Sequence, residues 1–375
     1  MESEHPCLFH FAKKRDGEQE VQLQPLPESI PEPMNILIVK LSAVGDVIHT
    51  LPSLAALRKL YPEAHITWVI EEASSDLIMD HPYLDSVIIS RRKQWIRDLK
   101  QGNINKPLHE MRAFIKTVRA RPYDLVIDFH GLLKSAVIVL MSSGRRKVGY
   151  DSMQELSGLF LNEKIPEDME KHAVDRYLDF LHHLGAEVRE REFMIPIGKE
   201  NRNRIEELLQ INGINKNEPF VTVSPVALWK TKLWEDEKFA RLCDRIMADL
   251  NVRIILTGSS EEELAHIQSL MKTSAINLGG KTTLRDLAYL YQLSSLLITT
   301  DSGPMHLAAA VGTPVVALFG PTDPGRTGPY GEGHQVIRKD LPCSPCFLKK
   351  CDTKRCMRDI TVEEVFQSVK EKLFA

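Results

Sequence analysis

Short apolar segments alternate with longer helical patterns along most of this chain. The first apolar run, residues 35–40 (NILIVK), is typical of a strand buried on both faces of a sheet. A helical pattern follows over residues 46–61 and stops at Pro62. Further strands are expected at 65–70, 87–89, 125–129 and 147–149, and a second series at 220–224, 253–257, 275–277, 296–299 and 314–319. Strands that alternate with helices predict an α/β fold with parallel sheets.

The restart of this pattern predicts two domains of similar, doubly wound architecture. A chain of 375 residues is long enough for two cores. We place the boundary in the polar stretch 185–199, which gives a first domain over residues 34–190 and a second over 191–375. Residues 1–33 are rich in Glu, Gln, Pro and Lys, and we expect a disordered leader or an early start codon before Met34. Doubly wound domains bind ligands at the carboxyl ends of strands, so the loops that follow strands are the informative ones.

The composition is that of a soluble globular protein, with 43% hydrophobic and 26% charged residues. A net charge of -3 offers no global basic field, so no nucleic-acid partner is expected. No apolar run approaches the roughly 20 residues that span a bilayer, and the N-terminus lacks the pattern of a secretory signal. We therefore expect a cytoplasmic enzyme. We also expect a monomer.

The loop after the first strand carries a carboxylate at the start of a helix. A dinucleotide-binding turn needs the glycines of G-x-G-x-x-G, and residues 41–49 contain only Gly45, which disfavours a nicotinamide or flavin enzyme. Gly45 instead lets a ligand approach the backbone beside Asp46. The Asp46 side chain is either a cap of the helix or a base that takes a proton from an acceptor hydroxyl.

A second strand-to-helix turn, residues 299–310 (TTDSGPMHLAAA), is made of small residues. Backbone N–H groups and the positive end of the helix would converge there, which is typical of a diphosphate site. The alternative is an ordinary turn in which Asp301 and Ser302 cap the helix and His306 is packed one turn inside. Residues 258–263 (GSSEEE) place carboxylates at another helix start, where they either stabilise the helix or bind the hydroxyls of a ribose.

A third loop in the second domain, residues 226–234 (VALWKTKLW), combines lysines with tryptophans. Lys230 or Lys232 can neutralise a phosphate, and Trp229 or Trp234 can stack on a base. Exposed lysines beside packed tryptophans are the alternative.

The first domain offers basic residues where an anionic acceptor would bind. Residues 128–135 (DFHGLLKS) follow a predicted strand, and their His130 and Lys134 are candidates for contacting an anion. A separate basic cluster lies near Trp95 and consists of Arg91, Arg92, Lys93 and Arg97. This cluster suits an acidic sugar or a lipid headgroup, or is only a solvated basic face.

Four of the six cysteines are clustered near the C-terminus. Cys343, Cys346, Cys351 and Cys356 have the spacing C-x2-C-x4-C-x4-C, which is compact enough for four thiolates to surround one structural zinc ion. Free thiols, disulfides and an iron–sulfur cluster are the alternatives. A catalytic zinc is not expected, because four protein ligands would leave no position open for substrate.

Four motifs together resemble the lipopolysaccharide heptosyltransferases of glycosyltransferase family 9, from about Met34 to the end of the chain. They are IVKLSAVGDVIHTLP, DFHGLLKSA, KTKLW and TDSGPMHLAAAVGTPVVALFGPTDP. DFHGLLKSA, together with KHAVDRYLDF at 171–180, is more similar to heptosyltransferase I than to heptosyltransferase II. The resemblance implies a GT-B architecture of two Rossmann-like domains, an ADP-heptose donor and a Kdo-lipid A acceptor. It also implies inversion at the anomeric carbon with no metal or other cofactor required for catalysis.

The resemblance further implies roles for individual residues. Asp46 matches the catalytic base, and Ser42 and Gly45 match positions that line the reaction centre. Lys232 matches the lysine at the donor phosphates, and Glu262 matches the carboxylate on the ribose side. The cradle for the diphosphate and the sugar is matched by Thr300, Asp301, Ser302, Gly303 and His306.

Alternatives stay open at this point. A family member with another sugar donor or core acceptor, such as a heptosyltransferase II-like enzyme, fits the same motifs. A remote alternative is a non-catalytic nucleotide-binding or zinc-dependent module, in which Asp46 would have no role. The stretch LWKT at 228–231 departs from the family's pattern, so either Lys230 or Lys232 meets phosphate. Because the implied acceptor is a lipid, we also expect peripheral docking on the inner leaflet through basic residues near Arg91 to Arg97.

Overall fold

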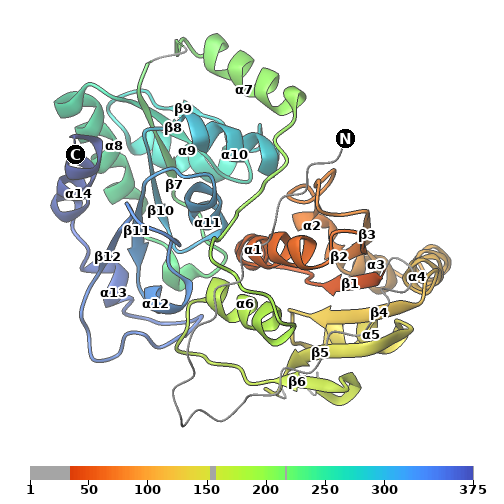
Figure 1. The fold of residues 1–375 in the computed structure, drawn as a ribbon. Helices are drawn as coiled ribbons and strands as arrows, with labels where there is room; N and C mark the ends of the chain where they lie inside the picture. Colours follow the sequence, from red (N-terminus) through yellow and green to blue (C-terminus); the bar gives the residue numbers. More distant parts are fainter. Residues whose placement is uncertain (1–33, 153–157, 216–217, 375) are drawn as a thin grey trace, which may run out of the picture. The chain divides into compact units, whose positions relative to one another are not determined.

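Two parallel six-stranded sheets form the framework of the protein (Figure 1). The computed structural model describes residues 34–152, 158–215 and 218–374. The predicted leader, residues 1–33, lies outside the described residues. The α/β fold with parallel sheets is confirmed.

The first sheet has the strand order β3-β2-β1-β4-β5-β6, with every neighbouring pair parallel. Its strands are β1 (Asn35–Val39), β2 (His65–Glu71), β3 (Ser86–Ser90), β4 (Tyr123–Asp128), β5 (Gly144–Tyr150) and β6 (Glu163–Ile165). The helices of this half are α1 (Val44–Leu60), α2 (Glu72–Ser75), α3 (Arg92–Lys100), α4 (Asn105–Val118), α5 (Leu133–Met141) and α6 (Ala173–His183). Because β1 lies between β2 and β4, the loops that follow these three strands leave the sheet side by side.

The second sheet has the order β12-β11-β10-β7-β8-β9 and is also parallel. Its strands are β7 (Phe220–Ser224), β8 (Arg253–Leu256), β9 (Ile276–Asn277), β10 (Leu296–Thr300), β11 (Val315–Phe319) and β12 (Gln335–Arg338). The helices are α7 (Lys199–Ile211), α8 (Asp236–Leu250), α9 (Glu261–Leu270), α10 (Leu284–Leu293), α11 (Gly303–Ala310), α12 (Pro324–Thr327), α13 (Arg355–Arg358) and α14 (Val362–Phe374), with a 3-10 turn, η2, at Lys230–Lys232.

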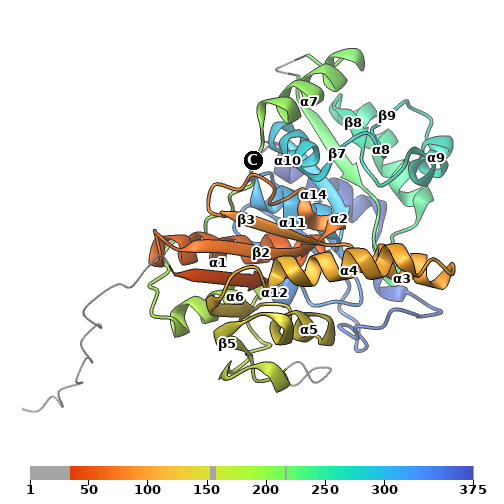
Figure 2. The ribbon, with the colours of Figure 1, turned by 90° about the vertical axis from the view of Figure 1, so that its right-hand side faces the viewer.

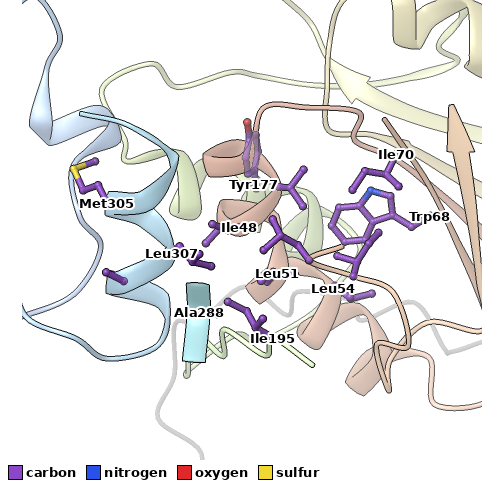
Figure 3. Close-up of a cluster of buried hydrophobic side chains, with 14 of the residues drawn as sticks. Ile48, Leu51, Leu54, Trp68, Ile70, Tyr177, Ile195, Ala288, Met305 and Leu307 are labelled. Carbon is purple, nitrogen blue, oxygen red and sulfur yellow. The ribbon is translucent and has the colours of Figure 1, made fainter. Parts of the chain in front are cut away.

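Helix α1 is buried almost all round, because it packs on α6 and also contacts α11 from the second half of the chain. Its Ile48, Leu51 and Leu54 lie between Trp68 of the first sheet and Leu307 of α11 (Figure 3). One hydrophobic cluster therefore runs from the first sheet to the second without a break. Residues 34 to 375 form one compact unit, so the division at residues 190 and 191 stays a prediction although the two sheets are separate.

None of the helices in the described ranges combines the length and the apolar character that crossing a bilayer requires.

Candidate functional site

The N-terminal ends of α1 and α11 meet at the carboxyl ends of their sheets, and two glycines permit this approach. A Cβ built on Gly45 would lie 2.3 Å from Cδ2 of His306. A Cβ on Gly303 would lie 3.1 Å from Cγ1 of Val44. A side chain at Gly45 would collide with the His306 ring, and one at Gly303 would crowd Val44. The close contact brings the Asp46 loop and the predicted diphosphate cradle together.

Asp46 is the third residue of α1, after the N-cap Ala43. Its Oδ2 accepts a hydrogen bond of 3.1 Å from the backbone N–H of Ala43. No hydrogen bond from the described part of the chain reaches Oδ1, and the side chain is half-buried. Asp46 therefore caps its helix with one oxygen while the other is available to a substrate hydroxyl.

A buried lysine that the sequence analysis missed lies close behind this loop. Nζ of Lys40 donates to the carbonyl of Phe129 at 3.0 Å and to the hydroxyl of Tyr177 at 2.5 Å. Burial lowers the pKa of Lys40, and the charges of Asp46 and Asp128 oppose this effect. The signal in the sequence was a lysine at the end of an otherwise apolar strand, where a charge is rarely buried without a partner.

His306 is not oriented toward solvent but shares a hydrogen bond with a second buried histidine. Its Nδ1 lies 2.9 Å from Nε2 of His49 on α1, and the ring of His172 packs edge-on against His49. Burial holds the pKa of His306 at about 4 and lowers that of His49 well below its usual range, so both rings are neutral near pH 7. With His49 as the donor, the remaining proton of His306 lies on Nε2, where it can be given to a ligand.

The predicted phosphate lysine and the predicted cradle aspartate form an ion pair. Nζ of Lys232 lies 2.6 Å from Oδ2 of Asp301, which also accepts from the Thr322 hydroxyl at 2.5 Å. The Lys232 ammonium lies 4.6 Å from the centre of the Trp229 ring. Lys230 is exposed and makes no ion pair with the described residues. This geometry favours Lys232 as the phosphate ligand.

The remaining tryptophan of this loop belongs to the core. Trp234 is buried and its indole donates to the carbonyl of Ile360 at 3.1 Å. Trp234 therefore cannot stack on a base, whereas Trp229 is only partly buried and lies between Lys232 and Lys349. Lys349 is a further cation that the sequence analysis did not select.

The turn before α11 brings the start of this helix to the carboxyl end of β10. Ser302 is the N-cap, but its side chain makes no capping hydrogen bond, and Gly303 begins the helix. The hydroxyl of Thr300 is buried and donates to the carbonyl of Val226. Thr300 thus holds the loop that carries Lys232 near α11. In the first turn of α11, Pro304 has no N–H and Met305 donates to the Ser302 carbonyl at 3.2 Å, so Gly303 supplies the N–H that is open to an anion.

Glu262 lies in the first turn of α9, at the carboxyl end of β8, and is exposed. Its own backbone N–H and the Ser260 hydroxyl lower its pKa. Its neighbour Glu263 is the residue that folds back, since it accepts from the backbone and the hydroxyl of Ser259. The Glu262 carboxylate consequently stays available to a ligand at this strand end.

Three basic residues predicted to contact the acceptor converge on a carboxylate that the sequence analysis missed. Glu71, at the end of β2, accepts from Arg92 at 3.2 Å and lies within 3.4 Å of the Lys134 ammonium. The same ammonium donates to the Ser42 hydroxyl at 2.8 Å. Lys93 contacts the other Glu71 oxygen at 3.3 Å, and Arg91 pairs with the adjacent Glu72.

Burial raises the pKa of Glu71, but the charges of Lys134 and Lys93 outweigh burial, so the carboxylate is ionised. We call Glu71, Arg92, Lys93 and Lys134 the Glu71 cluster.

A hollow beside the Glu71 cluster is lined by Glu71, Glu72, Ala73, Ser90, Arg91, Lys93, Gln94 and Arg97. The cluster carries three cations around one anion, and it reaches the Asp46 loop through Ser42. An anionic group bound in the hollow would lie beside Glu71, whose partner Lys134 contacts Ser42 in the loop that carries Asp46.

His130 contributes polarity but no charge near pH 7. Burial and the nearby Lys40 and Lys134 lower its pKa to about 2. Neither ring nitrogen has a hydrogen-bond partner among the described residues. The backbone around it is fixed by Asp128, which accepts from the N–H groups of His130 and Gly131 and from the Ser135 hydroxyl. His130 can therefore donate or accept a hydrogen bond, but it cannot neutralise an anion.

The cysteine cluster does not form a ligand set as it stands. Within the described ranges, which include all four cysteines, no group of three or more His, Cys, Asp or Glu side chains is arranged to hold a metal ion. Cys343 and Cys351 are exposed, and all four thiols are free. Burial and, to a smaller extent, the neighbouring thiols raise the pKa of Cys356. A structural zinc ion stays a prediction.

A family model described as glycosyltransferase family 9 (heptosyltransferase) matches residues 111–357. Lipopolysaccharide heptosyltransferase 1 of Pseudomonas aeruginosa is 30% identical over 323 residues, which cover 85% of this chain and 87% of that protein. Lipopolysaccharide heptosyltransferase 1 of Escherichia coli K12 is 29% identical over 311 residues, which cover 81% of this chain and 93% of that protein.

Solved structures of the same family are similar to this chain in fold. A family 9 glycosyl transferase from Veillonella parvula has a TM-score of 0.77 and 26% identity, covering 91% of this chain and 97% of that one. The E. coli heptosyltransferase WaaC with ADP has a TM-score of 0.73 and 26% identity, covering 90% and 100%. The fold is thus that of the GT-B heptosyltransferases, and the chain belongs to glycosyltransferase family 9.

Proposed function

We propose that this enzyme transfers heptose from ADP-heptose to Kdo-lipid A in lipopolysaccharide biosynthesis. The observation that carries the proposal is the contact between α1 and α11, which puts the Asp46 carboxylate beside the diphosphate cradle. The names of the relatives support the reaction, and E. coli WaaC was solved with ADP and with a fluorinated ADP-heptose.

The reaction is an in-line displacement that inverts the anomeric carbon. Oδ1 of Asp46 removes the proton from an acceptor hydroxyl, and that oxygen forms a bond to the anomeric carbon of heptose. The bond from this carbon to the diphosphate breaks on the opposite side, and ADP leaves. Lys232, the Gly303 N–H and the positive end of α11 meet the charge that develops on the leaving phosphate. We propose that no metal takes part in catalysis.

Donor recognition uses the second half of the chain. Thr300, Asp301, Ser302 and Gly303 shape the diphosphate cradle, and Nε2–H of His306 is placed to donate toward the donor. We propose that Glu262, at the end of β8, binds the ribose hydroxyls. Trp229 would then lie near the nucleotide.

Acceptor recognition uses the first half. The Glu71 cluster and Arg91 present cations to the acidic sugars of the acceptor, and Lys134 connects them to Ser42 beside the base. The acceptor is anchored in lipid, so we propose a cytoplasmic enzyme that works at the inner leaflet as a monomer.

A second candidate is another reaction of the same family. Lipopolysaccharide heptosyltransferase 3 of E. coli and lipooligosaccharide heptosyltransferase 2 of Campylobacter jejuni are 26% and 25% identical to this chain. Another core acceptor would use the same base and the same donor cradle.

The decisive test compares the parent enzyme with Asp46→Asn, because an asparagine oxygen can still accept from the Ala43 N–H. Loss of the base is expected to slow ADP release from ADP-heptose with Kdo-lipid A by about 10²- to 10⁴-fold, with little change in thermal stability. Asp168→Asn is the matched control, since Asp168 also accepts a backbone N–H, from Glu170, but is exposed and remote in sequence.

Full activity of Asp46→Asn would reduce Asp46 to a helix cap. A parent enzyme that releases ADP only with a heptosylated core acceptor would favour the second candidate.

A further inference from the structure

Helices α3, α4 and α5 of the first half present apolar side chains to solvent. α4 contacts both α3 and α5, and Figure 2 shows the three helices on one side of the first sheet. The exposed apolar residues on this side are Ile96, Leu99, Ile104, Leu108, Val137 and Leu140. Ile104 and Leu140 are more than half exposed, at 57% and 51%. We call this side the α3–α5 face.

The charge of the α3–α5 face is almost entirely positive. Between residues 91 and 121 the chain has two acidic residues, Asp98 and Glu110, and ten basic ones, although its overall net charge is -3. Asp98 is buried, and Glu110 accepts a hydrogen bond from the Trp95 indole. The exposed basic side chains of residues 91–121 that make no ion pair within the described part of the chain are Arg97, Lys100, Lys106, Arg112, Lys116, Arg119 and Arg121.

We propose that the α3–α5 face docks the enzyme on an anionic phospholipid bilayer. Apolar side chains interleaved with unpaired Lys and Arg are what an interfacial helix uses, because the apolar groups enter the headgroup boundary while the cations meet the lipid phosphates. A single-stranded nucleic acid would need exposed aromatic rings, but Trp95 is buried and Phe114 packs edge-on against it. The charge and the apolar groups together therefore favour a lipid surface.

This face continues directly into the proposed acceptor site. α5 carries Lys134 near its start, where the ammonium contacts Ser42 and Glu71, and carries Val137 and Leu140 further along. A bilayer against the face would present the headgroup of an embedded acceptor at the Lys134 end. That docking serves to present the acceptor rests on the proposed function, but binding of the enzyme to a bilayer can be tested without an acceptor.

The structure also separates two groups of cations that the sequence analysis treated together. Arg91, Arg92 and Lys93 pair with Glu71 or Glu72. The unpaired cations lie further along, from Arg97 to Arg121. The first group belongs to the acceptor site, and the second belongs to the docking face.

The experiment measures cosedimentation of the full-length enzyme with phosphatidylcholine vesicles, with and without phosphatidylglycerol. Binding is expected only with phosphatidylglycerol and is expected to weaken in high salt. Arg112→Glu with Lys116→Glu is expected to reduce the vesicle partition coefficient at least tenfold, and Ile104→Asn with Leu108→Asn should reduce it several-fold. Lys272→Glu with Lys370→Glu is the matched control, because both lysines are exposed and lie outside the face.

A second readout separates this inference from the proposed reaction. The charge-reversed variant should lose heptosyl transfer to acceptor embedded in vesicles while retaining transfer to a deacylated, soluble acceptor. Vesicle binding by a parent enzyme that transfers no heptose would leave the inference standing and overturn the reaction. Vesicle binding by the charge-reversed and apolar variants equal to that of the parent would overturn the inference. A second result would also overturn the inference. If the parent enzyme is dimeric by light scattering and the variants are monomeric but bind vesicles equally well, the face joins two copies of the chain.

Discussion

Glu71 ends a strand that is buried along nearly its whole length, and its side chain is only 3% exposed. The buried carboxylate holds three cations in place, because each cation is attracted to the same anion although the cations repel one another. The carboxylate thereby positions Lys134 between Ser42 and the acceptor hollow.

Glu71→Gln is expected to raise the KM for the acceptor about tenfold, since the uncompensated cations separate and Lys134 leaves Ser42. The KM for ADP-heptose should stay unchanged, because the donor residues lie elsewhere. Steady-state kinetics with both substrates varied provide the measurement, with Glu72→Gln as the control, because Glu72 is exposed and pairs only with Arg91. A lower acceptor KM in Glu71→Gln would show that Glu71 merely repels the acceptor.

Lys232 and Lys230 differ by two positions and by their surroundings, which makes them a matched pair. Lys232→Met is expected to weaken ADP binding by about tenfold to a hundredfold, because a charge-assisted contact to phosphate is lost. Lys230→Met should bind ADP as the parent does. Calorimetric titration with ADP measures both, and thermal unfolding checks that the Asp301 left without its partner does not unfold the variant. Equal losses in the two variants would contradict the assignment to Lys232.

At the scale of elements, the contact between α1 and α11 decides whether a site exists. Gly45 is buried, and its Cα faces the ring of His306 at a distance that leaves no room for a methyl group. The hydrogen bond between His49 and His306 lies one turn further along the same contact.

Gly45→Ala is expected to destabilise the fold by roughly 1–3 kcal/mol, because an extra methyl group in a packed contact displaces its neighbours. ADP release should fall as well, since the shift separates Asp46 from the cradle. Urea denaturation measures the stability. Gly198→Ala is the control, because a Cβ there meets only Asn201 at an ordinary 3.5 Å and the backbone has a negative φ of -77°. A Gly45→Ala variant as stable as the parent would show that the two helices are not held in contact in solution.

The molecule as a whole buries several neutral histidines, and this sets its response to acid. Burial lowers the pKa of His81 and His306 to about 4 and that of His49 well below its usual range. Nδ1 of His81 accepts from the Tyr83 N–H, so protonation there breaks a hydrogen bond. In the unfolded chain the pKa of these histidines returns to about 6.5. The unfolded state therefore binds more protons than the folded state between pH 6.5 and 4.

The free energy of unfolding should therefore decrease as the pH falls below about 6.5, by up to about 1.4 kcal/mol per pH unit for each of these histidines. Urea denaturation at a series of pH values measures the slope. His81→Asn should reduce the slope by about one proton, whereas replacing the exposed His109 with Asn should not change it. A stability that is constant from pH 7 to pH 5 would contradict the assignment of neutral buried histidines.

The sequence by itself determined the α/β class, the strands that form the centre of each sheet and the loops that carry the site. This was possible because buried parallel strands are continuous apolar runs, and the order along the chain fixes which loop follows each strand. The edge strands β6 and β12 and the polar helix α3 were missed, because their residues are only partly buried and form no apolar run.

Only the tertiary structure decided which of the candidate side chains share a site. The order β2-β1-β4 brings Lys134 to Ser42 and Glu71, which lie 92 and 63 positions earlier in the chain. Likewise, the contact between α1 and α11 pairs His49 with His306 across 257 positions. Local patterns report burial along one element, whereas these contacts depend on how the crossovers order the strands and on which helices pack against each other.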